Sequence, residues 1–237
     1  MSRQEYYLED SYCKELTSSI ETIDTNGIKL KQVLFYPRGG GQPDDRGVLM
    51  HNNKSYQVTA IDKTDHGIYL KVDDRGDLQV GDEVNQQIDW DYRYKLMKHH
   101  TTLHILSAVV WDKFQAKVTG GTIYHDKARL DFDLQEFNSE LAKQLVDEVN
   151  KIIQQDHKIS ISFVNRQEAE QDPDLIRTKI NLLPPSITEL RLVKIGNVDI
   201  QADGGLHVRQ TSEIGQVELV KTENKGKGRK RITVSAS

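Results

Sequence analysis

The chain has 237 residues, of which 36% are hydrophobic and 29% are charged, with a formal net charge of −4 at pH 7. This size accommodates one large globular domain or two modest ones, and the slight acidity excludes a protein that binds nucleic acid over its whole surface. No apolar run reaches the roughly 18 residues that a membrane-spanning helix needs, so a membrane partner is not expected.

The N-terminal segment is polar and lacks the apolar core of a secretory signal peptide. Cys13 is the single cysteine in the sequence, which excludes an internal disulfide bond. Both features favour a reducing compartment, and we expect a cytoplasmic protein.

Residues 1–90 are predicted to be rich in β-strand. Short alternating or β-branched runs are separated by turn signals such as Asn26-Gly27 and Arg75-Gly76. Several short strands at this spacing predict a small barrel-like domain. We expect these strands at residues 33–36, 48–50, 55–60, 68–72 and 83–89.

Residues 91–237 are predicted to form an α+β domain with an antiparallel sheet. Apolar residues recur at three- and four-residue steps over residues 92–114, which predicts a helix with Asp91 as its N-cap. A second amphipathic helix is predicted over residues 139–155, with Asn138 as its cap. Extended segments are expected at 118–133, 160–164, 191–195, 198–200, 207–210, 216–222 and 231–234, with a short acidic helix at 166–177.

Two clusters of metal-ligating residues are the strongest chemical signal in the sequence. His100 and His104 lie four residues apart on the first predicted helix, so both imidazoles project from one face. Asp203 and His207 flank Gly204-Gly205, which gives the backbone freedom to turn. These four side chains predict a tetrahedral zinc site, or three ligands plus a water. The alternative is an ordinary glycine turn that Asp203 caps before a strand.

His99 is a weaker candidate for the same cluster. It projects about 100° away from His100 on an ideal helix, so we expect it to be solvated or to support a ligand.

A run of three glycines, Gly39-Gly40-Gly41, is followed by Gln42 and Pro43. Such a run costs conformational entropy, which suggests a close backbone approach or positive φ angles. As a phosphate cradle the signal is weak, because neither a Walker lysine nor a helix pattern follows it. A plain loop is an equally good interpretation.

Residues 221–231 carry six basic residues against one acidic residue. A solvated hairpin turn is the ordinary interpretation of a basic run of this length. Because Gly226 and Gly228 would let backbone amides approach phosphates, contact with a nucleic-acid backbone also fits.

These motifs together resemble the AlaX family of free-standing alanyl-tRNA editing proteins, relatives of the editing domain of alanyl-tRNA synthetase. His100 to His104 is similar to the family's His-x-x-x-His motif, and residues 203–208 are similar to its Cys-Gly-Gly-Thr-His-Val motif. Residues 211–215 resemble Thr-Gly-Glu-Ile-Gly, and the glycine-rich element and basic ending also match. The resemblance covers essentially the whole chain and implies the medium-length form, with a barrel-like domain before an editing domain.

Two positions depart from the family pattern. Asp203 stands where the family usually has cysteine, and Leu206 where it usually has threonine. A carboxylate is a competent zinc ligand that is harder than a thiolate, so we expect metal binding to persist. The leucine removes a hydroxyl that could contact substrate or water.

The resemblance implies a zinc-dependent hydrolase that cleaves the ester of tRNA(Ala) mischarged with serine or glycine. It implies that His100, His104, Asp203 and His207 are both the zinc ligands and the catalytic residues. Zinc could activate a water molecule, or it could position the substrate's amino group. Substrate or tRNA contacts are expected from Gly39, Gly40, Gly41, Gln42, Thr101, Lys225, Lys227, Arg229, Lys230 and Arg231.

Two other functions fit the same residues. The changes at Asp203 and Leu206 could have produced a non-catalytic tRNA-binding relative. The metal site could also hydrolyse another small ester or amide.

Overall fold

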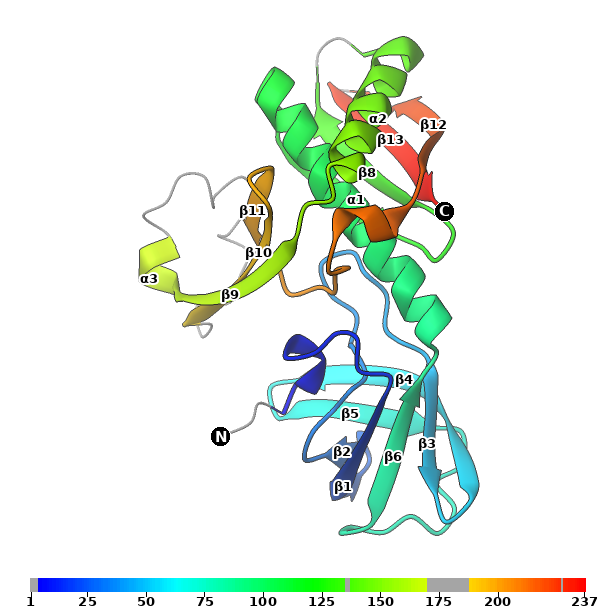
Figure 1. Cartoon of the computed structure of the whole chain (residues 1–237). Helices are drawn as coiled ribbons and strands as arrows, with labels where there is room; N and C mark the ends of the chain where they lie inside the picture. Colours follow the sequence, from blue (N-terminus) through cyan, green and yellow to red (C-terminus); the bar gives the residue numbers. More distant parts are fainter. Residues whose placement is uncertain (1–3, 135–136, 170–187, 227) are drawn as a thin grey trace. The chain divides into compact units, whose positions relative to one another are not determined.

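The computed structural model describes residues 4–134, 137–169, 188–226 and 228–237. The chain divides into two compact units, Met1–Tyr94 and Lys95–Ser237 (Figure 1). Across these described ranges, no helix is both long and apolar enough to cross a membrane.

The first unit is a closed six-stranded barrel with strand order β1-β2-β5-β4-β3-β6, in which every neighbouring pair is antiparallel. This confirms the predicted barrel. The β1–β2 hairpin was not among the expected strands, although its Asn26-Gly27 turn was. A short 3-10 helix, η1 (Tyr6–Leu8), precedes β1. The strands are β1 (Glu15–Asp24), β2 (Gly27–Leu30), β3 (Gly47–His51), β4 (Lys54–Thr64), β5 (Gly67–Val72) and β6 (Glu83–Ile88).

The strand predicted at residues 33–36 is wrong. These residues are buried, but distant side chains satisfy their backbone in place of a strand ladder. Leu34 N donates to Gln86 Oε1 at 2.8 Å, and Tyr36 N donates to Asp45 Oδ2 at 2.6 Å. The apolar pattern therefore identified burial correctly, but the hydrogen-bond partners made the segment irregular.

Helix α1 (Trp90–Phe114) carries both histidines of the first motif. It begins two residues before the predicted start, because Asp89 Oδ1 accepts a hydrogen bond from Tyr92 N at 3.1 Å. Asp89 is therefore the capping residue, and Asp91 lies in the first turn, where an acidic side chain favours the helix.

A four-stranded antiparallel sheet, ordered β12-β13-β8-β7, and helix α2 belong to the second unit. The predicted second helix is confirmed as α2 (Ser139–Gln154), whose Asn138 cap accepts a hydrogen bond from Leu141 N. Asn150 on α2 joins the helix to β12 by two hydrogen bonds with the backbone of Val217, at 2.8 and 2.9 Å. The strands are β7 (Val118–Ile123), β8 (Ala128–Asp133), β12 (Val217–Asn224) and β13 (Arg229–Ala236).

A three-stranded antiparallel sheet, ordered β11-β10-β9, presents two different faces. One face packs on the short helix α3 (Arg166–Ala169) through a cluster that includes Leu190, Leu192 and Ile200. Alternation along the strands places Arg191, Asp199 and Gln201 on the opposite face, where all three are buried. The strands are β9 (Ile159–Asn165), β10 (Glu189–Ile195) and β11 (Asp199–Ala202). The rest of the predicted acidic helix, beyond residue 169, lies outside the described residues.

The strand predicted at residues 207–210 is also wrong. This segment does not pair with β9 as a strand, although Ile159 N at the start of β9 donates a hydrogen bond to Arg209 O at 2.8 Å. Glu213 Oε1 instead accepts from the backbone amides of Arg209 and Gln210, and the 3-10 helix η4 (Thr211–Ile214) follows. The Thr-Ser-Glu-Ile-Gly motif is thus a capping structure that ends the loop after His207.

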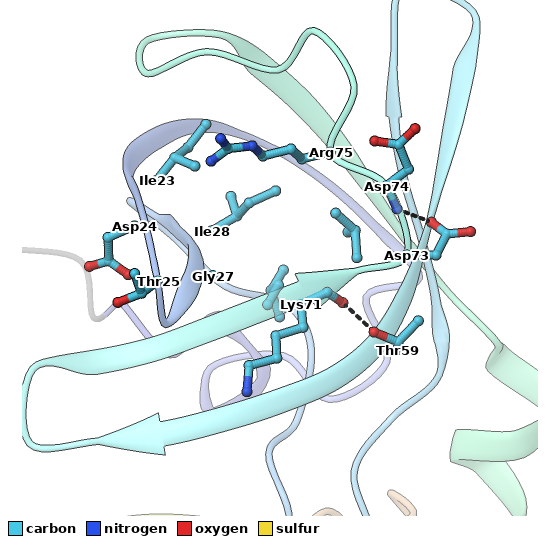
Figure 2. Close-up of a pocket in the computed structure, with 12 residues that line it drawn as sticks. Ile23, Asp24, Thr25, Gly27, Ile28, Thr59, Lys71, Asp73, Asp74 and Arg75 are labelled. Carbon is cyan, nitrogen blue, oxygen red and sulfur yellow. Dashed lines mark hydrogen bonds between the residues drawn. The ribbon is translucent and has the colours of Figure 1, made fainter.

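A shallow pocket opens on the barrel beside the β1–β2 turn (Figure 2). Ile23 and Ile28 point into it with Arg75 beside them, and Lys71 and Asp73 also line the pocket. Because charges of both signs border this apolar floor, the pocket favours no single class of ligand.

A buried ion pair fixes the glycine-rich loop within the first unit. The side chains of Arg93 and Asp45 are 0% and 1% exposed, and the guanidinium bonds to both carboxylate oxygens. Arg93 also donates to Leu34 O at 2.7 Å, and Asp45 accepts from Tyr36 N. The two ends of the loop between Tyr36 and Asp45 are therefore held by one charged network.

We predict that Arg93→Met destabilises the protein by about 3–5 kcal/mol, because it leaves the Asp45 carboxylate buried without its counter-charge. Urea unfolding measures this loss. Lys54→Met is the control, since it breaks an ion pair with Asp77 in which both side chains are more than half exposed. Equal effects of the two substitutions would contradict the prediction.

Candidate metal centre

The two predicted clusters converge in the second unit. One potential ligand atom from each of His100, His104, Asp203 and His207 lies within 4.8 Å of the others. The Asp203 carboxylate is 3.4 Å from His100 Nε2, 3.7 Å from His104 Nε2 and 3.4 Å from His207 Nε2. Helix α1 and the glycine turn therefore bring together residues about a hundred positions apart.

The separations between the Asp203 carboxylate and the three imidazoles are close to those of a zinc site. Four ligands that are about 2.0–2.2 Å from one ion at tetrahedral angles lie about 3.3–3.6 Å from each other. The observed separations from Asp203 fall in or next to this range. The imidazole ring centroids are 4.3–5.3 Å apart, and one potential ligand atom of each ring lies within 4.8 Å of the others. The donor set matches the nitrogen and oxygen preference of zinc.

The electrostatics of the cluster favour a charged carboxylate. Burial raises the pKa of Asp203, but the charge of His100 and hydrogen bonds to His100, His104 and His207 outweigh it and hold that pKa well below its usual range. Burial and the neighbouring His100 lower the pKa of His207 well below its usual value, so His207 is neutral and its lone pair is available. Burial also disfavours charge on His104, but hydrogen bonds to Asp199 and Asp203 raise its pKa to about 10. The carboxylates of Asp199 and Asp203 thus balance positive charge in this buried site.

Each of two histidines in the cluster is held by a group on its Nδ1 atom. His104 Nδ1 lies 3.1 Å from Asp199 Oδ2, and His207 Nδ1 lies 3.2 Å from Thr101 Oγ1. Thr101 is fully buried, and its hydroxyl also donates to Met97 O at 2.9 Å. The hydroxyl therefore supports His207, and its contact with a substrate stays a prediction.

The sequence did not reveal three supporting residues, Arg191, Asp199 and Gln201. Arg191 Nη1 donates to the carbonyl oxygens of Asp203 and Gly205, both at 2.9 Å, and so fixes the ligand turn. Gln201 donates to both carboxylate oxygens of Asp199, at 3.1 and 2.9 Å. Alternating polar residues usually mark the solvated face of a strand. Here they form a buried face, so the sequence pattern carried no signal of their role.

Gly205 is required by the close approach of His100. A Cβ atom at position 205 would lie 2.2 Å from His100 Cε1 and 2.5 Å from His100 Nδ1. A Cβ atom at Gly204 would meet nothing within 4 Å. Gly205 N also donates to Asp203 Oδ1, so the turn orients the carboxylate as well.

His99 does not have the solvated position considered for it. It is 1% exposed, and its Nε2 accepts a hydrogen bond from Ala236 N on β13 at 3.2 Å. Burial lowers the pKa of His99 to about 4, so this imidazole is neutral at pH 7. His99 therefore fastens α1 to the end of the four-stranded sheet.

The glycine-rich element lies in the first unit. Gly40 and Gly41 are exposed and adopt positive φ angles of 57° and 87°, which explains the need for glycine there. Gly39 and Gln42 close the loop by reciprocal backbone hydrogen bonds of 3.1 and 2.8 Å. The Gln42 side chain is buried. A contact of Gly39, Gly40, Gly41 or Gln42 with tRNA stays a prediction.

The basic residues near the C-terminus form the predicted hairpin turn between β12 and β13, and they differ in environment. Lys225 and Arg229 are exposed, and Lys225 Nζ pairs with Glu223 Oε1 at 3.1 Å. Lys230 is buried, and Arg231 is held by Asp131 at 2.6 and 2.7 Å. Lys227 lies outside the described residues. Lys225 and Arg229 are therefore the best placed of the described basic residues in this turn to meet a phosphate.

We predict that Gly205→Ala weakens zinc binding at least about 10-fold, because the new methyl group displaces His100 from the ligand cluster. Competition with a chromophoric chelator measures the affinity. Gly204→Ala is the matched control and should bind zinc as the wild type does. If both substitutions leave the affinity unchanged, zinc binding does not depend on the close approach of His100 to position 205.

Comparison with known proteins shows which family the chain is similar to. Residues 7–92 match the family described as tRNA synthetases class II (A), and residues 190–233 match the threonyl and alanyl tRNA synthetase second additional domain. The chain is 41% identical to the alanyl-tRNA editing protein AlaX-M of Saccharolobus solfataricus, over 97% of each chain.

Two further relatives extend this relationship. AlaX-M of Methanosarcina mazei is 35% identical, over 99% of this chain and 96% of its own length. The alanine–tRNA ligase of Pyrococcus abyssi is 34% identical over 95% of this chain, which corresponds to 25% of the ligase. Identity of this level over nearly the full length shows that the chain belongs to the AlaX-M family of alanyl-tRNA editing proteins.

Proposed function

We propose that this protein is a trans-editing hydrolase that deacylates tRNA(Ala) mischarged with serine, and also with glycine. The ester bond is cleaved at a zinc site formed by His100, His104, Asp203 and His207. The observation that carries the proposal is the convergence of these four side chains in a chain that matches AlaX-M proteins over nearly their full length.

The donor set suggests how the site would work. Zinc in this site would supply a fixed positive charge beside the substrate, and four protein ligands favour a positioning role over activation of a bound water. Asp203 is the most exposed of the four ligands, with 16% of its side chain accessible against 7% or less for the histidines. The aminoacyl end would therefore approach from the Asp203 side, while the buried imidazoles exclude water from the other sides.

The tRNA backbone would be held in part by the β12–β13 turn. Lys225 and Arg229 are exposed there, and phosphate contacts from such side chains position a nucleic acid without reading its sequence. The glycine-rich loop, with its exposed Gly40 and Gly41, is proposed to meet the 3′ end of the tRNA.

We predict that His100→Ala lowers the rate of seryl-tRNA(Ala) deacylation by more than about 100-fold, because it removes a metal ligand. The assay measures serine released from mischarged tRNA, together with the zinc content of the purified protein. His66→Ala is the control, since His66 is exposed in the first unit.

The same assay separates the alternatives. A wild-type protein that binds tRNA but releases no serine or glycine would be a non-catalytic relative. Hydrolysis of small esters that tRNA does not inhibit would identify another metal hydrolase.

We predict that the double substitution Lys225→Gln and Arg229→Gln weakens tRNA binding and makes it less dependent on salt. The slope of log affinity against log salt concentration should fall by roughly one for each lost phosphate contact. Binding is measured by filter retention at several salt concentrations. Lys151→Gln, an exposed change on α2, is the control. An unchanged slope would show that the turn does not contact the tRNA backbone.

A further inference from the structure

The buried polar face of the three-stranded sheet is directed at the candidate metal centre. Asp199 and Gln201 alternate along β11 with Ile200 and Ala202, whose side chains pack in the apolar cluster on the other face. The Asp199 side chain has no exposed surface, and Gln201 is 4% exposed. A fully buried carboxylate is costly unless it is bonded to partners that need its charge.

Those partners are Gln201 and His104. The Gln201 amide donates to both Asp199 oxygens, at 3.1 and 2.9 Å, and this fixes the plane of the carboxylate. Asp199 Oδ2 then lies 3.1 Å from His104 Nδ1. On the other side of the same ring, His104 Nε2 lies 3.7 Å from Asp203 Oδ2. His104 is thus placed between a supporting carboxylate and the ligand cluster.

We propose that Asp199 is a positioning residue for the metal centre, which acts through His104. By accepting a hydrogen bond from Nδ1–H, Asp199 holds the imidazole with Nε2 directed into the ligand cluster and makes Nε2 a stronger electron-pair donor to a metal. Gln201 holds Asp199 in this orientation. The inference rests on the proposed zinc site and adds three buried groups, Asp199, Gln201 and the His104 Nδ1–H, to the machinery that forms it.

The test is the zinc affinity of Asp199→Asn, measured by chelator competition well below the melting temperature. The substitution keeps the size of the side chain and removes its charge. We expect binding to weaken 10–100-fold, in keeping with the loss of a supporting carboxylate. Gln201→Met, which leaves the Asp199 charge in place but frees its orientation, should cause a smaller loss in the same direction.

Two controls separate positioning from general destabilisation. Asp147→Asn makes the same chemical change on the exposed side of α2 and should not alter the affinity. Asn150→Ala removes the two hydrogen bonds to Val217, so it should lower the melting temperature and leave the zinc affinity of the folded protein unchanged. A merely structural role for Asp199 would make Asp199→Asn behave like Asn150→Ala.

A measurement on the wild-type protein tests the inference even if Asp199→Asn fails to fold. In the zinc-loaded wild type, long-range proton–nitrogen NMR should show His104 bound through Nε2 and protonated at Nδ1. Binding of His104 through Nδ1 would overturn the inference, as would an unchanged affinity in Asp199→Asn. If the wild type binds no zinc at all, the proposed metal site itself fails, which is a distinguishable outcome.

Discussion

Three imidazoles and a carboxylate held within 4.8 Å of one another, largely out of water, can coexist only if their charges are balanced. Asp203 supplies that balance inside the cluster, and Asp199 supplies it from behind His104. Asp203 is accordingly ionised and His207 neutral, whereas His104, whose pKa is raised to about 10, would have to release a proton for a metal ion to bind. The arrangement of the second unit can be understood from this electrostatic constraint.

The two faces of the three-stranded sheet have different roles: one packs in the hydrophobic core, and the other places polar groups at the histidine cluster. Its apolar face is stabilised by burial against α3, through residues such as Leu190 and Leu192. Its other face directs Arg191 at the carbonyl groups of Asp203 and Gly205, and Asp199 at His104. A hydrophobic core on one side thus provides the rigidity with which polar groups on the other side are placed.

Local sequence signals predicted the elements that depend on local interactions. Helix α2 and its Asn138 cap agree with the pattern within one residue, because amphipathic spacing and capping are encoded within a few positions. The segment at residues 33–36 and the loop at residues 207–210 were predicted as strands and are not. Leu34 N donates to the Gln86 side chain, 52 residues away, and the amides of Arg209 and Gln210 donate to the Glu213 side chain, so the residue pattern of each segment did not show that side chains would replace a strand partner.

The candidate site was likewise predicted only in part. The His100/His104 spacing and the Asp203-Gly-Gly turn could be recognised, because a helix and a glycine pair constrain their geometry directly. Asp199 looked like an ordinary polar position on a half-buried strand. Its role became visible only when the fold placed it behind His104, since a sequence pattern cannot show which face of a strand other elements will cover.

The presence of Asp203 where the family pattern has cysteine affects more than the identity of the donor atom. A thiolate offers one sulfur, whereas this carboxylate uses both oxygens: Oδ2 faces His100 and His104, and Oδ1 faces His207. Oδ1 also accepts a hydrogen bond from Gly205 N, the residue whose lack of a side chain admits His100. The carboxylate therefore links the turn to all three imidazoles before any metal binds. Preorganisation of this kind lowers the cost of bringing together side chains from separate segments.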